Sequence, residues 1–593
     1  METNRPGHQP STNPILLTRI GWAVLIIATL YVCYFSHLGA LGFVGPDEPR
    51  YAWIARDMAE SGDWVTPRLY GKPWFEKPPL LYWGAALSFK LFGVSEATAR
   101  LPSAVSALLA TLALAWLALR LCGAETARWL LLFLPTTVGM IGFSHAAATD
   151  MPFGAMLTIA MVAAAVVVGL GQETNETVVG DVAAGGALRP SSGQGSHSPT
   201  RVRLALICFG FFLGLAVLAK GPAGIILCGG SVFFWAVFTK RWRETFRLLH
   251  PAAIGAFCVT ALPWYILCAR RNSDFVRVFI IEHNFKRYLT PEFQHIQRFW
   301  YYIPILLIAL VPWTGWSVSA VTYVFRKKLE MRPDTSSIYL LSWILFPLIF
   351  FSISKSKLPG YILPAVPPFV MLTAISLCRA LRMPKVPVPA GFAVLALTPV
   401  TLAAAQSAST YIERAKWLPQ DIAAVSAIIA VVSGTACLVF AWNGRRALLM
   451  ASGVICLVML VEANNILLLP SLDRVISARI VGQRVSKYPQ SARAIVAFRL
   501  KRGWQYGLNF YIHREIEEWG EDSNQPVTAV VSLDGVAELR RRHLEFTVID
   551  DSSFEAMVIQ IGKPDPGKTK SNQLAPRAVG GNRNKKKLTT RFS

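Results

Sequence analysis

Thirteen apolar runs divide this 593-residue chain, and most are long enough to cross a lipid bilayer. A transmembrane helix needs about 20 predominantly apolar residues. Charged residues make up only 16% of the chain, against about 25% in soluble domains. The sequence therefore predicts a polytopic α-helical membrane protein with about 13 transmembrane helices. We expect these helices near residues 18–42, 97–120, 127–144, 151–170, 203–219, 222–239, 251–269, 299–325, 336–354, 360–378, 387–406, 421–442 and 447–469.

Basic residues lie in every second connection between the expected helices. If the N-terminus is cytoplasmic, all of these connections are cytoplasmic too, as the positive-inside rule requires. The net charge of +24 then reflects basic loops that face anionic lipid, and it requires no nucleic-acid partner. The basic connections lie at residues 120–128, 201–203, 240–243, 326–328, 379–385 and 445–446. The opposite face receives residues 43–96, 149–150, 220–222, 270–298, 354–361, 407–420 and the chain after 470.

Composition predicts the domain boundaries. The apolar runs place a membrane domain at residues 17–469, and a mixed pattern of short strands and helices predicts a small soluble α/β domain at 470–562 on the outer face. The first apolar run is not followed by a small-residue cleavage site, so we expect it to remain as an anchor. Three polar segments complete the chain: a disordered cytoplasmic N-terminus (1–16), a flexible cytoplasmic insertion rich in Gly and Ser (171–202), and a disordered basic tail (563–593).

The first outer loop, residues 43–96, is long for a connection between membrane spans and carries many charged and aromatic residues. Asp47 precedes an amphipathic helix whose Trp and Tyr residues favour a position along the membrane interface. Two roles are open for Asp47. It could cap this helix, which takes only one carboxylate before the first turn, or it could act as a general base on an acceptor hydroxyl. The local pattern alone favours the cap.

Other polar residues of the outer face have similar pairs of interpretations. Glu76 and Lys77 precede two prolines that hold the backbone extended, so they form either a surface turn or a fixed part of a site. Asp150 is either a helix cap or a site residue at the end of a span. Lys220 could simply extend toward water, and His283 could be a hydrogen-bonded surface group.

Taken together, the cations of the outer face suggest a shared ligand. Lys and Arg are unfavoured on this side of a membrane protein, and they are the residues that bind phosphate through point charges and forked donors. We therefore predict a phosphate or diphosphate site formed by Arg50, Lys77, Lys220, Arg287, Lys355 and Lys357.

Several of these motifs resemble a known family. Asp-Glu-Pro-Arg-Tyr-Ala (47–52), Ser-Gly-Asp-Trp (61–64), Pro-Arg-Leu (67–69) and Phe-Glu-Lys-Pro-Pro-Leu-Leu-Tyr-Trp (75–83) look like the first outer loop of bacterial ArnT-like glycosyltransferases. That family transfers aminoarabinose to lipid A and is related to the protein O-mannosyltransferases, which share the GT-C membrane fold. Residues 354–364, 149–152, 219–222 and 282–284 fit further family signatures in the same order. The resemblance covers about residues 15–370.

The resemblance implies an inverting transfer of a sugar from a polyprenyl (undecaprenyl) phosphate donor at the periplasmic face of the bacterial inner membrane. The acceptor would be lipid A, another envelope glycolipid or, as in the related mannosyltransferases, a protein. The outer loops and the α/β domain would then be periplasmic. No soluble nucleotide cofactor would be needed, because the sugar arrives on a lipid.

The resemblance also implies roles for individual residues. Asp47 would be the base that activates the acceptor, with Asp150 as a second carboxylate nearby. Glu76 and His283 would be candidate ligands of a divalent metal ion. The remaining roles are shared by groups: Arg50, Lys77, Arg287, Lys220, Lys355 and Lys357 would hold the donor phosphate, while Tyr51, Tyr82 and Tyr361 would line the cavity.

Two other classes of protein remain open. A sugar or lipid transporter, such as a flippase, would use the outer cations as a translocation path, and it should show broken helices, charges at the membrane midplane or two related halves. A membrane scaffold would leave Asp47 and Glu76 replaceable. Because this chain places its charges at the ends of spans and in one long loop, the sequence favours the enzyme.

Overall fold

A computed structural model gives the fold. It describes residues 14–170, 199–279, 282, 297–330, 334–382, 420–487, 495–520, 527–551, 553 and 555–562. These residues form two compact units. The first comprises the described residues up to Lys487 together with Lys501–Glu515, and the second comprises those in Tyr488–Leu500 and from Ile516 onward.

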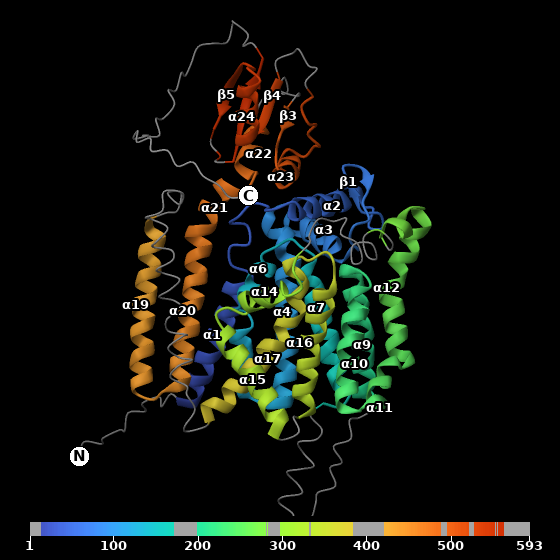
Figure 1. Ribbon diagram of the computed structural model, residues 1–593, viewed down its shortest axis with the longest axis vertical. Coiled ribbons are helices and arrows are strands. Elements are labelled where there is room, and N and C mark those ends of the chain that lie inside the picture. Colours follow the sequence, from blue (N-terminus) through green and yellow to red (C-terminus); the bar gives the residue numbers. More distant parts are fainter. Residues whose placement is uncertain are drawn as a thin grey trace, which may run out of the picture. The chain divides into compact units, whose positions relative to one another are not determined.

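The first unit is almost entirely helical (Figure 1). Its first half contains α1 (Pro14–Tyr34), α2 (Asp47–Ser61), β1 (Arg68–Leu69), β2 (Lys72–Pro73), α3 (Leu80–Phe92), α4 (Glu96–Cys122), α5 (Ala124–Phe133), α6 (Val138–Ser144), α7 (Asp150–Val167), α9 (Pro199–Lys220), α10 (Ala223–Thr239), α11 (Trp242–Phe246), η1 (Arg247–Leu249) and α12 (Pro251–Arg271). Its second half contains α14 (Tyr302–Ala309), α15 (Thr314–Glu330), α16 (Thr335–Ile353), η3 (Pro359–Ala365), α17 (Val366–Arg382), α19 (Gln420–Trp442), α20 (Arg446–Ala463), η5 (Asn464–Leu468), α21 (Leu469–Ile476), α22 (Arg479–Val485) and α23 (Arg502–Ile512).

The described residues include seven helices that are long and apolar enough to cross a membrane, and up to nine if each bent pair of helices is one span. One pair, α5 and α6, bends by 61°, and the other, α14 and the start of α15, bends by 117°. Pro135 and Pro312 lie at the two breaks, where a proline removes a backbone hydrogen bond of a continuous helix. The expected multi-pass architecture is confirmed. The number thirteen is not confirmed. Four further apolar helical stretches among the described residues, Thr18–Tyr34, Leu80–Phe92, Ala223–Thr239 and Ala424–Phe440, are shorter than 18 residues, and residues 387–406 lie outside the described residues.

The connection between α1 and α4 forms a small folded layer at one end of the long helices (Figure 1). It contains α2, the β1–β2 hairpin and α3. The expected amphipathic helix is α2, whose buried stripe packs against α3 through Ile54, Met58 and Tyr82. The helix ends at Gly62, whose φ of 75° is the left-handed conformation that glycine adopts readily, and whose N–H donates to the carbonyl of Met58.

The α23 helix packs in the first unit, although its sequence follows the first strand of the second unit. It contacts α2 and α22. The amide of Asn509 donates to the Tyr70 hydroxyl at 2.9 Å, and the ring of Phe510 meets Phe43 edge-on at 4.8 Å. The domain boundary at residue 470 stays a prediction, and the compact first unit includes α21, α22 and α23.

The second unit is a four-stranded sheet with one helix. It contains β3 (Ile495–Phe498), β4 (Val527–Ser532), α24 (Leu533–Arg541), β5 (Phe546–Asp550) and β6 (Ala556–Ile561). The strand order is β3-β4-β6-β5, in which β3 and β4 are parallel and the other two pairs are antiparallel. Its core joins Ala529, Val531 and Ile559 of the sheet to Leu539 of α24. The mixed pattern of short strands and helices predicted within 470–562 corresponds here to β3, β4, β5, β6 and α24.

Candidate active site

Arg50 is the centre of a charged cluster in the first-loop layer. Its side chain is only 7% exposed. The guanidinium contacts Asp47 on one side and Glu76 on the other, with 3.0 Å between Nη1 and Glu76 Oε2, and Nε donates to the carbonyl of Pro46 at 2.9 Å. Burial alone would lower the pKa of Arg50, but Glu76, Tyr51 and Asp47 outweigh it and raise that pKa above its usual value. The Arg50 guanidinium is therefore a permanent cation between two carboxylates.

Aromatic rings surround this guanidinium. Its central carbon lies 5.5 Å from the ring centre of Trp74, 5.4 Å from that of Tyr506 and 5.8 Å from that of Tyr51. Such contacts stabilise a cation, and more so when water is excluded. The Tyr51 ring contacts Tyr82 at 5.7 Å, so two of the three tyrosines predicted to line a cavity lie together beside Arg50.

The Asp47 carboxylate is accessible to a ligand. The α2 helix begins at Asp47 and Pro46 occupies the cap position, where no side-chain cap hydrogen bond occurs in the described structure. The capping role that the local sequence favoured is therefore wrong. Asp47 contacts Arg50 instead, and half of its side chain (49%) is exposed. A carboxylate that is oriented by a buried arginine and accessible to solvent has the geometry of a proton acceptor.

Glu76 and Lys77 belong to the same cluster. Lys77 Nζ lies 3.7 Å from Glu76 Oε1, and both side chains are largely buried. The Tyr82 hydroxyl is buried as well, and it has no hydrogen-bond partner within the described residues. A buried polar group without a partner costs free energy unless a ligand or water satisfies it. The hydroxyl is therefore a contact that a bound ligand could complete.

Glu48 and Arg100 form a buried ion pair directly behind this cluster. Arg100 is 3% exposed and Glu48 is 7% exposed. Arg100 donates two hydrogen bonds to the Glu48 carboxylate, each of 2.9 Å, and three more to backbone carbonyls of residues 38, 41 and 42. The same carboxylate accepts the N–H groups of Val44 and Ala147 at 2.8 and 2.7 Å. The pair fixes the backbone that leads into α2, and so fixes Asp47.

A second arginine holds the same backbone from the C-terminal side of the first unit. Arg479 donates to the carbonyls of residues 39 and 40 at 2.8 and 2.9 Å and pairs with Asp473 at 2.5 Å. Asp473 in turn accepts the N–H of Gly42 at 2.7 Å. The Tyr511 hydroxyl accepts the N–H of Phe43 at 3.0 Å and donates to Glu96 at 2.9 Å. Residues 38–44 are thus held by side chains of α4, α21, α22 and α23.

A second charged group forms where α7, α9 and η3 meet. Lys220 Nζ lies 2.5 Å from Asp150 Oδ1. The ammonium stands over the ring of Tyr361 at 4.7 Å and over that of Phe153 at 5.4 Å. No side-chain cap hydrogen bond occurs at the start of α7 in the described structure, so capping by Asp150 is wrong as well. Gly360 allows the backbone of η3 to approach the Asp150 carboxylate closely, because a Cβ at that position would lie 2.3 Å from Asp150 Oδ1.

Lys357 and Lys355 lie in the turn between α16 and η3. Lys357 is only 6% exposed and donates to the carbonyl of Ser354 at 2.5 Å, whereas Lys355 is exposed. Burial, and to a lesser extent the charge of Lys355, lowers the pKa of Lys357 below that of an ordinary lysine. A buried ammonium next to a second cation is well suited to bind an anion.

The two charged groups are connected through Glu48. Glu48 follows Asp47 in the chain, and its carboxylate accepts the N–H of Ala147, which lies three residues before Asp150. Beside Glu76 lies a cavity of about 580 Å³. Its walls are Pro73–Glu76 on one side and Arg271–Asp274 with Arg277 and Val278 on the other. The cavity offers room for a ligand next to the Arg50 cluster.

Not every predicted residue can be placed. Arg287 and His283 lie outside the described residues. For a metal ion, this leaves only Glu76 of the predicted pair, and both of its oxygens face cations, Arg50 and Lys77. Among the residues that the structure describes, no group of three His, Cys, Asp or Glu side chains gathers. The described residues therefore do not fit a metal ion at Glu76.

Sequence reasoning missed three parts of the site. Arg100 was counted within an apolar span, although a charged residue inside such a run is itself a signal of function or of a buried partner. Glu48 was noted only as part of a motif. Tyr506 and Tyr511 reach the first loop from more than 400 residues away, and nothing local in α23 indicates that contact.

The chain is similar in sequence to known mannosyltransferases and arabinosyltransferases. Sequence models of the family described as dolichyl-phosphate-mannose-protein mannosyltransferase match residues 76–188 and 193–279. An undecaprenyl phosphate-alpha-4-amino-4-deoxy-L-arabinose arabinosyl transferase of Edwardsiella ictaluri is 32% identical over 356 residues, which are 60% of this chain and 59% of that protein. The same-named protein of Pseudomonas aeruginosa is 31% identical over 364 residues, covering 61% of this chain and 60% of its own length. The match thus spans about three fifths of these relatives.

A solved structure covers more of the chain. The crystal structure of ArnT from Cupriavidus metallidurans bound to undecaprenyl phosphate aligns with 92% of this chain and 99% of that chain, with a TM-score of 0.71 and 23% identity. The apo structure of the same protein aligns with a TM-score of 0.69. At this level of identity the similarity establishes a shared fold.

Proposed function

We propose that this chain, which is related to the ArnT-like membrane glycosyltransferases, is an integral membrane enzyme that transfers a sugar from an undecaprenyl-phosphate donor to an acceptor at the periplasmic face. The observation that carries the proposal is the Arg50 cluster. A buried guanidinium holds a half-exposed carboxylate, Asp47, and a buried carboxylate, Glu76, that lines a cavity. The loop that carries them is fixed by Arg100 and Arg479.

The donor phosphate would meet the cations of this site. Arg50, Lys77, Lys220 and Lys357 are all held in fixed positions by carboxylates or a carbonyl. In the reaction the sugar–phosphate bond breaks, and the lipid phosphate leaves with the bonding electrons. Prearranged cations stabilise the charge that develops on the leaving oxygen. Lys355 and Arg287 would add to this field, and Tyr82 would offer a hydroxyl to the bound ligand.

Asp47 would act on the acceptor. If the acceptor is a hydroxyl group, Asp47 takes its proton as the oxygen attacks the anomeric carbon from the face opposite the phosphate, which inverts the configuration. Asp150 would serve as the second carboxylate, with its orientation set by Lys220. The proposed reaction needs no soluble nucleotide, because the donor named for the related transferases is a lipid-linked sugar. No step is routed through a metal ion, because both oxygens of Glu76 face cations.

We also propose the orientation and the finer architecture. The basic connections at 240–243 and 445–446 would face the cytoplasm of a bacterial inner membrane, and α2 and α3, at the other end of the helices, would face the periplasm (Figure 1). The α/β unit would be periplasmic, and a total of about 13 transmembrane helices would include one in the 387–406 segment. Lipid A, another envelope glycolipid or a protein would be the acceptor.

The test is transfer from synthetic undecaprenyl-phosphate sugars by the purified full-length protein, with lipid A and with peptides as separate acceptors. Asp47→Asn keeps the shape of the side chain and removes the base, so we expect turnover with a hydroxyl acceptor to fall about 10²–10⁴-fold. Glu60→Gln is a matched control, because Glu60 lies on the same helix, is equally exposed (49%) and pairs with Arg56. Full turnover by Asp47→Asn would show that the base assignment is wrong.

One observation favours the rival transporter class. The two bent helix pairs are broken helices of the kind that line translocation paths. Proteoliposomes that contain a fluorescent undecaprenyl-phosphate analogue separate the two functions. An enzyme should transfer the sugar without moving the lipid, whereas a flippase should make the probe accessible on both faces without transfer.

A further inference from the structure

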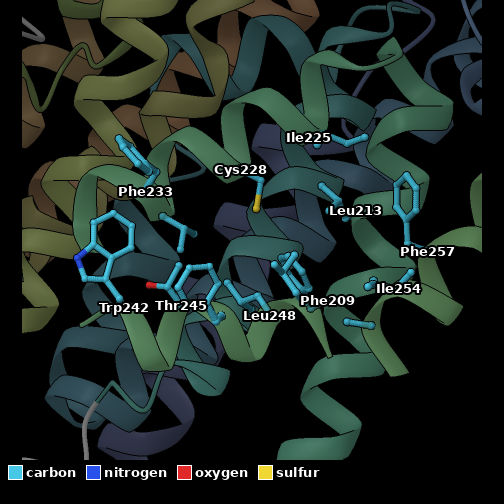
Figure 2. Close-up of a pocket in the computed structure, with 16 residues that line it drawn as sticks. Phe209, Leu213, Ile225, Cys228, Phe233, Trp242, Thr245, Leu248, Ile254 and Phe257 are labelled. Atoms are coloured by element: carbon cyan, nitrogen blue, oxygen red, sulfur yellow. The ribbon is translucent and has the colours of Figure 1, made fainter. Parts of the chain in front are cut away.

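A second cavity reaches along the helices from the α11–η1 turn. This turn lies at the opposite end of the helices from α2 and α3 (Figure 1). The volume of the cavity is about 380 Å³, and α9, α10, α12 and the α11–η1 turn surround it. Figure 2 shows Leu213 of α9, Cys228 of α10 and Leu248 of η1 pointing from three elements toward the same space. The Thr245 hydroxyl, the one hydroxyl among the lining residues, donates to the carbonyl of Arg241. The walls are therefore suited to a hydrocarbon chain.

The cavity lies between two pairs of helices that are in close contact, α9 with α12 and α10 with α16. On α9, Gly210 touches α12 so closely that a Cβ there would lie 2.0 Å from the carbonyl oxygen of Ala253. On α10, Gly230 packs in the same way against Phe346 of α16. At Gly229, in contrast, an added Cβ would meet nothing within 4 Å. The α10 helix is thus held to α16 and the α9 helix to α12, and the cavity lies between the two pairs.

The mouth of the cavity has the composition of a membrane interface. Trp242, Phe246 and Leu249 line the cavity and are 39%, 61% and 63% exposed. The Trp242 ring lies 5.6 Å from that of Phe233, which is 52% exposed. Tryptophan is enriched where the hydrocarbon core of a membrane meets the headgroups. The α11–η1 turn is therefore expected to lie at that boundary.

Positive charge is concentrated in the same turn. Residues 240–250 contain Lys240, Arg241, Arg243 and Arg247 and one acid, Glu244, so four cations against one carboxylate give a formal charge of +3. Arg243 and Arg247 are exposed, and each is adjacent in the chain to residues that line the cavity. Basic residues near the membrane surface attract anionic lipid headgroups.

We propose that this cavity binds one anionic phospholipid, with an acyl chain between α9, α10 and α12 and its phosphate against Arg243 and Arg247. The site is separate from the proposed donor site, whose Lys220 is the last residue of α9 and does not line this cavity.

The first experiment measures lipid retention and stability of the full-length protein. We expect native mass spectrometry to show one retained phosphatidylglycerol, and phosphatidylglycerol to raise the midpoint of thermal unfolding more than phosphatidylcholine does. Gly229→Leu should fill the cavity and weaken phosphatidylglycerol retention about tenfold. Gly255→Leu is the matched control, because Gly255 is exposed on α12 and its Cβ would also meet nothing within 4 Å. Equal retention by both glycine variants and the unmodified protein would overturn the proposal.

The headgroup contact needs its own variants. Arg243→Gln with Arg247→Gln should abolish the preference for phosphatidylglycerol, whereas Arg445→Gln with Arg446→Gln, which removes the same charge beside α20, should keep it. Stabilisation by phosphatidylcholine equal to that by phosphatidylglycerol would contradict the anionic site. A phosphatidylglycerol with a photoreactive acyl chain tests the unmodified protein directly. It should label peptides of α9, α10 and α12, and labelling confined to other helices would exclude the cavity as the site.

Discussion

Replacing Arg100 by lysine tests the argument that the first loop is held from behind. The guanidinium makes five hydrogen bonds, two to Glu48 and three to backbone carbonyls. Lysine keeps the charge but has only three donors on one nitrogen, so at least two of the five bonds are lost. A hydrogen bond to a charged group contributes about 1.5–3 kcal/mol. We therefore expect Arg100→Lys to destabilise the first-loop layer by about 3–5 kcal/mol, the cost typical of disrupting a buried pair.

Hydrogen exchange of the Val44 and Ala147 amides reports this loss directly, since both donate to Glu48. With tenfold for every 1.4 kcal/mol, protection of these amides should fall about a hundredfold to a few thousandfold. Arg277→Lys is the control. Arg277 pairs with Asp274 and Glu282 on the surface, where such pairs contribute little to stability. The exchange of the Val44 and Ala147 amides should therefore be unchanged in Arg277→Lys.

A double variant makes the prediction sharper. Buried ion pairs can often be replaced by apolar residues without loss of stability. Here Glu48→Gln with Arg100→Met should not recover stability, because the three carbonyls that Arg100 binds would still lose their donors. If Arg100→Lys exchanges like the unmodified protein, or if the double variant is as stable as that protein, the proposed role of Arg100 is refuted.

Three further predictions concern the candidate site. Gly360→Ala should push the Asp150 carboxylate away from Lys220 and reduce turnover about tenfold with an unchanged unfolding midpoint, whereas Gly142→Ala, with nothing near its Cβ, should leave turnover intact. Lys355→Met should raise the pKa of Lys357, because it removes a neighbouring positive charge. Since the protonated amine binds phosphate, donor binding should then be lost at a higher pH than in the unmodified protein. An unmoved pH profile would contradict this. Tyr506→Leu should weaken donor binding several-fold by removing a ring from Arg50, and unaltered binding would show that the ring has no such role.

The sequence predicted most of the membrane architecture because apolar length is a local property. Each run of about 20 apolar residues can be counted without knowledge of its neighbours. The amphipathic α2 helix followed from the same local periodicity. The bends at Pro135 and Pro312 were missed, although a proline is visible in the sequence, because a proline can also be accommodated in a continuous membrane helix, as Pro347 is in α16.

The cations of the proposed site were predicted as one set, and most of their partners were not predicted. Counting cations on one face singled out Arg50 and Lys220 without knowledge of which carboxylate each would meet. The capping interpretation of Asp47 and Asp150 was wrong. Asp47 pairs instead with Arg50, a local contact between positions i and i+3 of α2. Lys220 reaches Asp150 only through the packing of α9 against α7, which the sequence does not show.

The least predictable contacts are those that decide how Asp47 must be tested. Glu48 meets Arg100 across 52 residues, and Gly42 meets Asp473 across 431. Both contacts fix the backbone from which Asp47 projects. A variant of Glu48 or Arg100 can therefore abolish turnover by moving the carboxylate, with no chemical role of its own. Only a loss of turnover in Asp47→Asn with unchanged protection of the Val44 and Ala147 amides supports a base, because that combination separates the chemistry of Asp47 from its position.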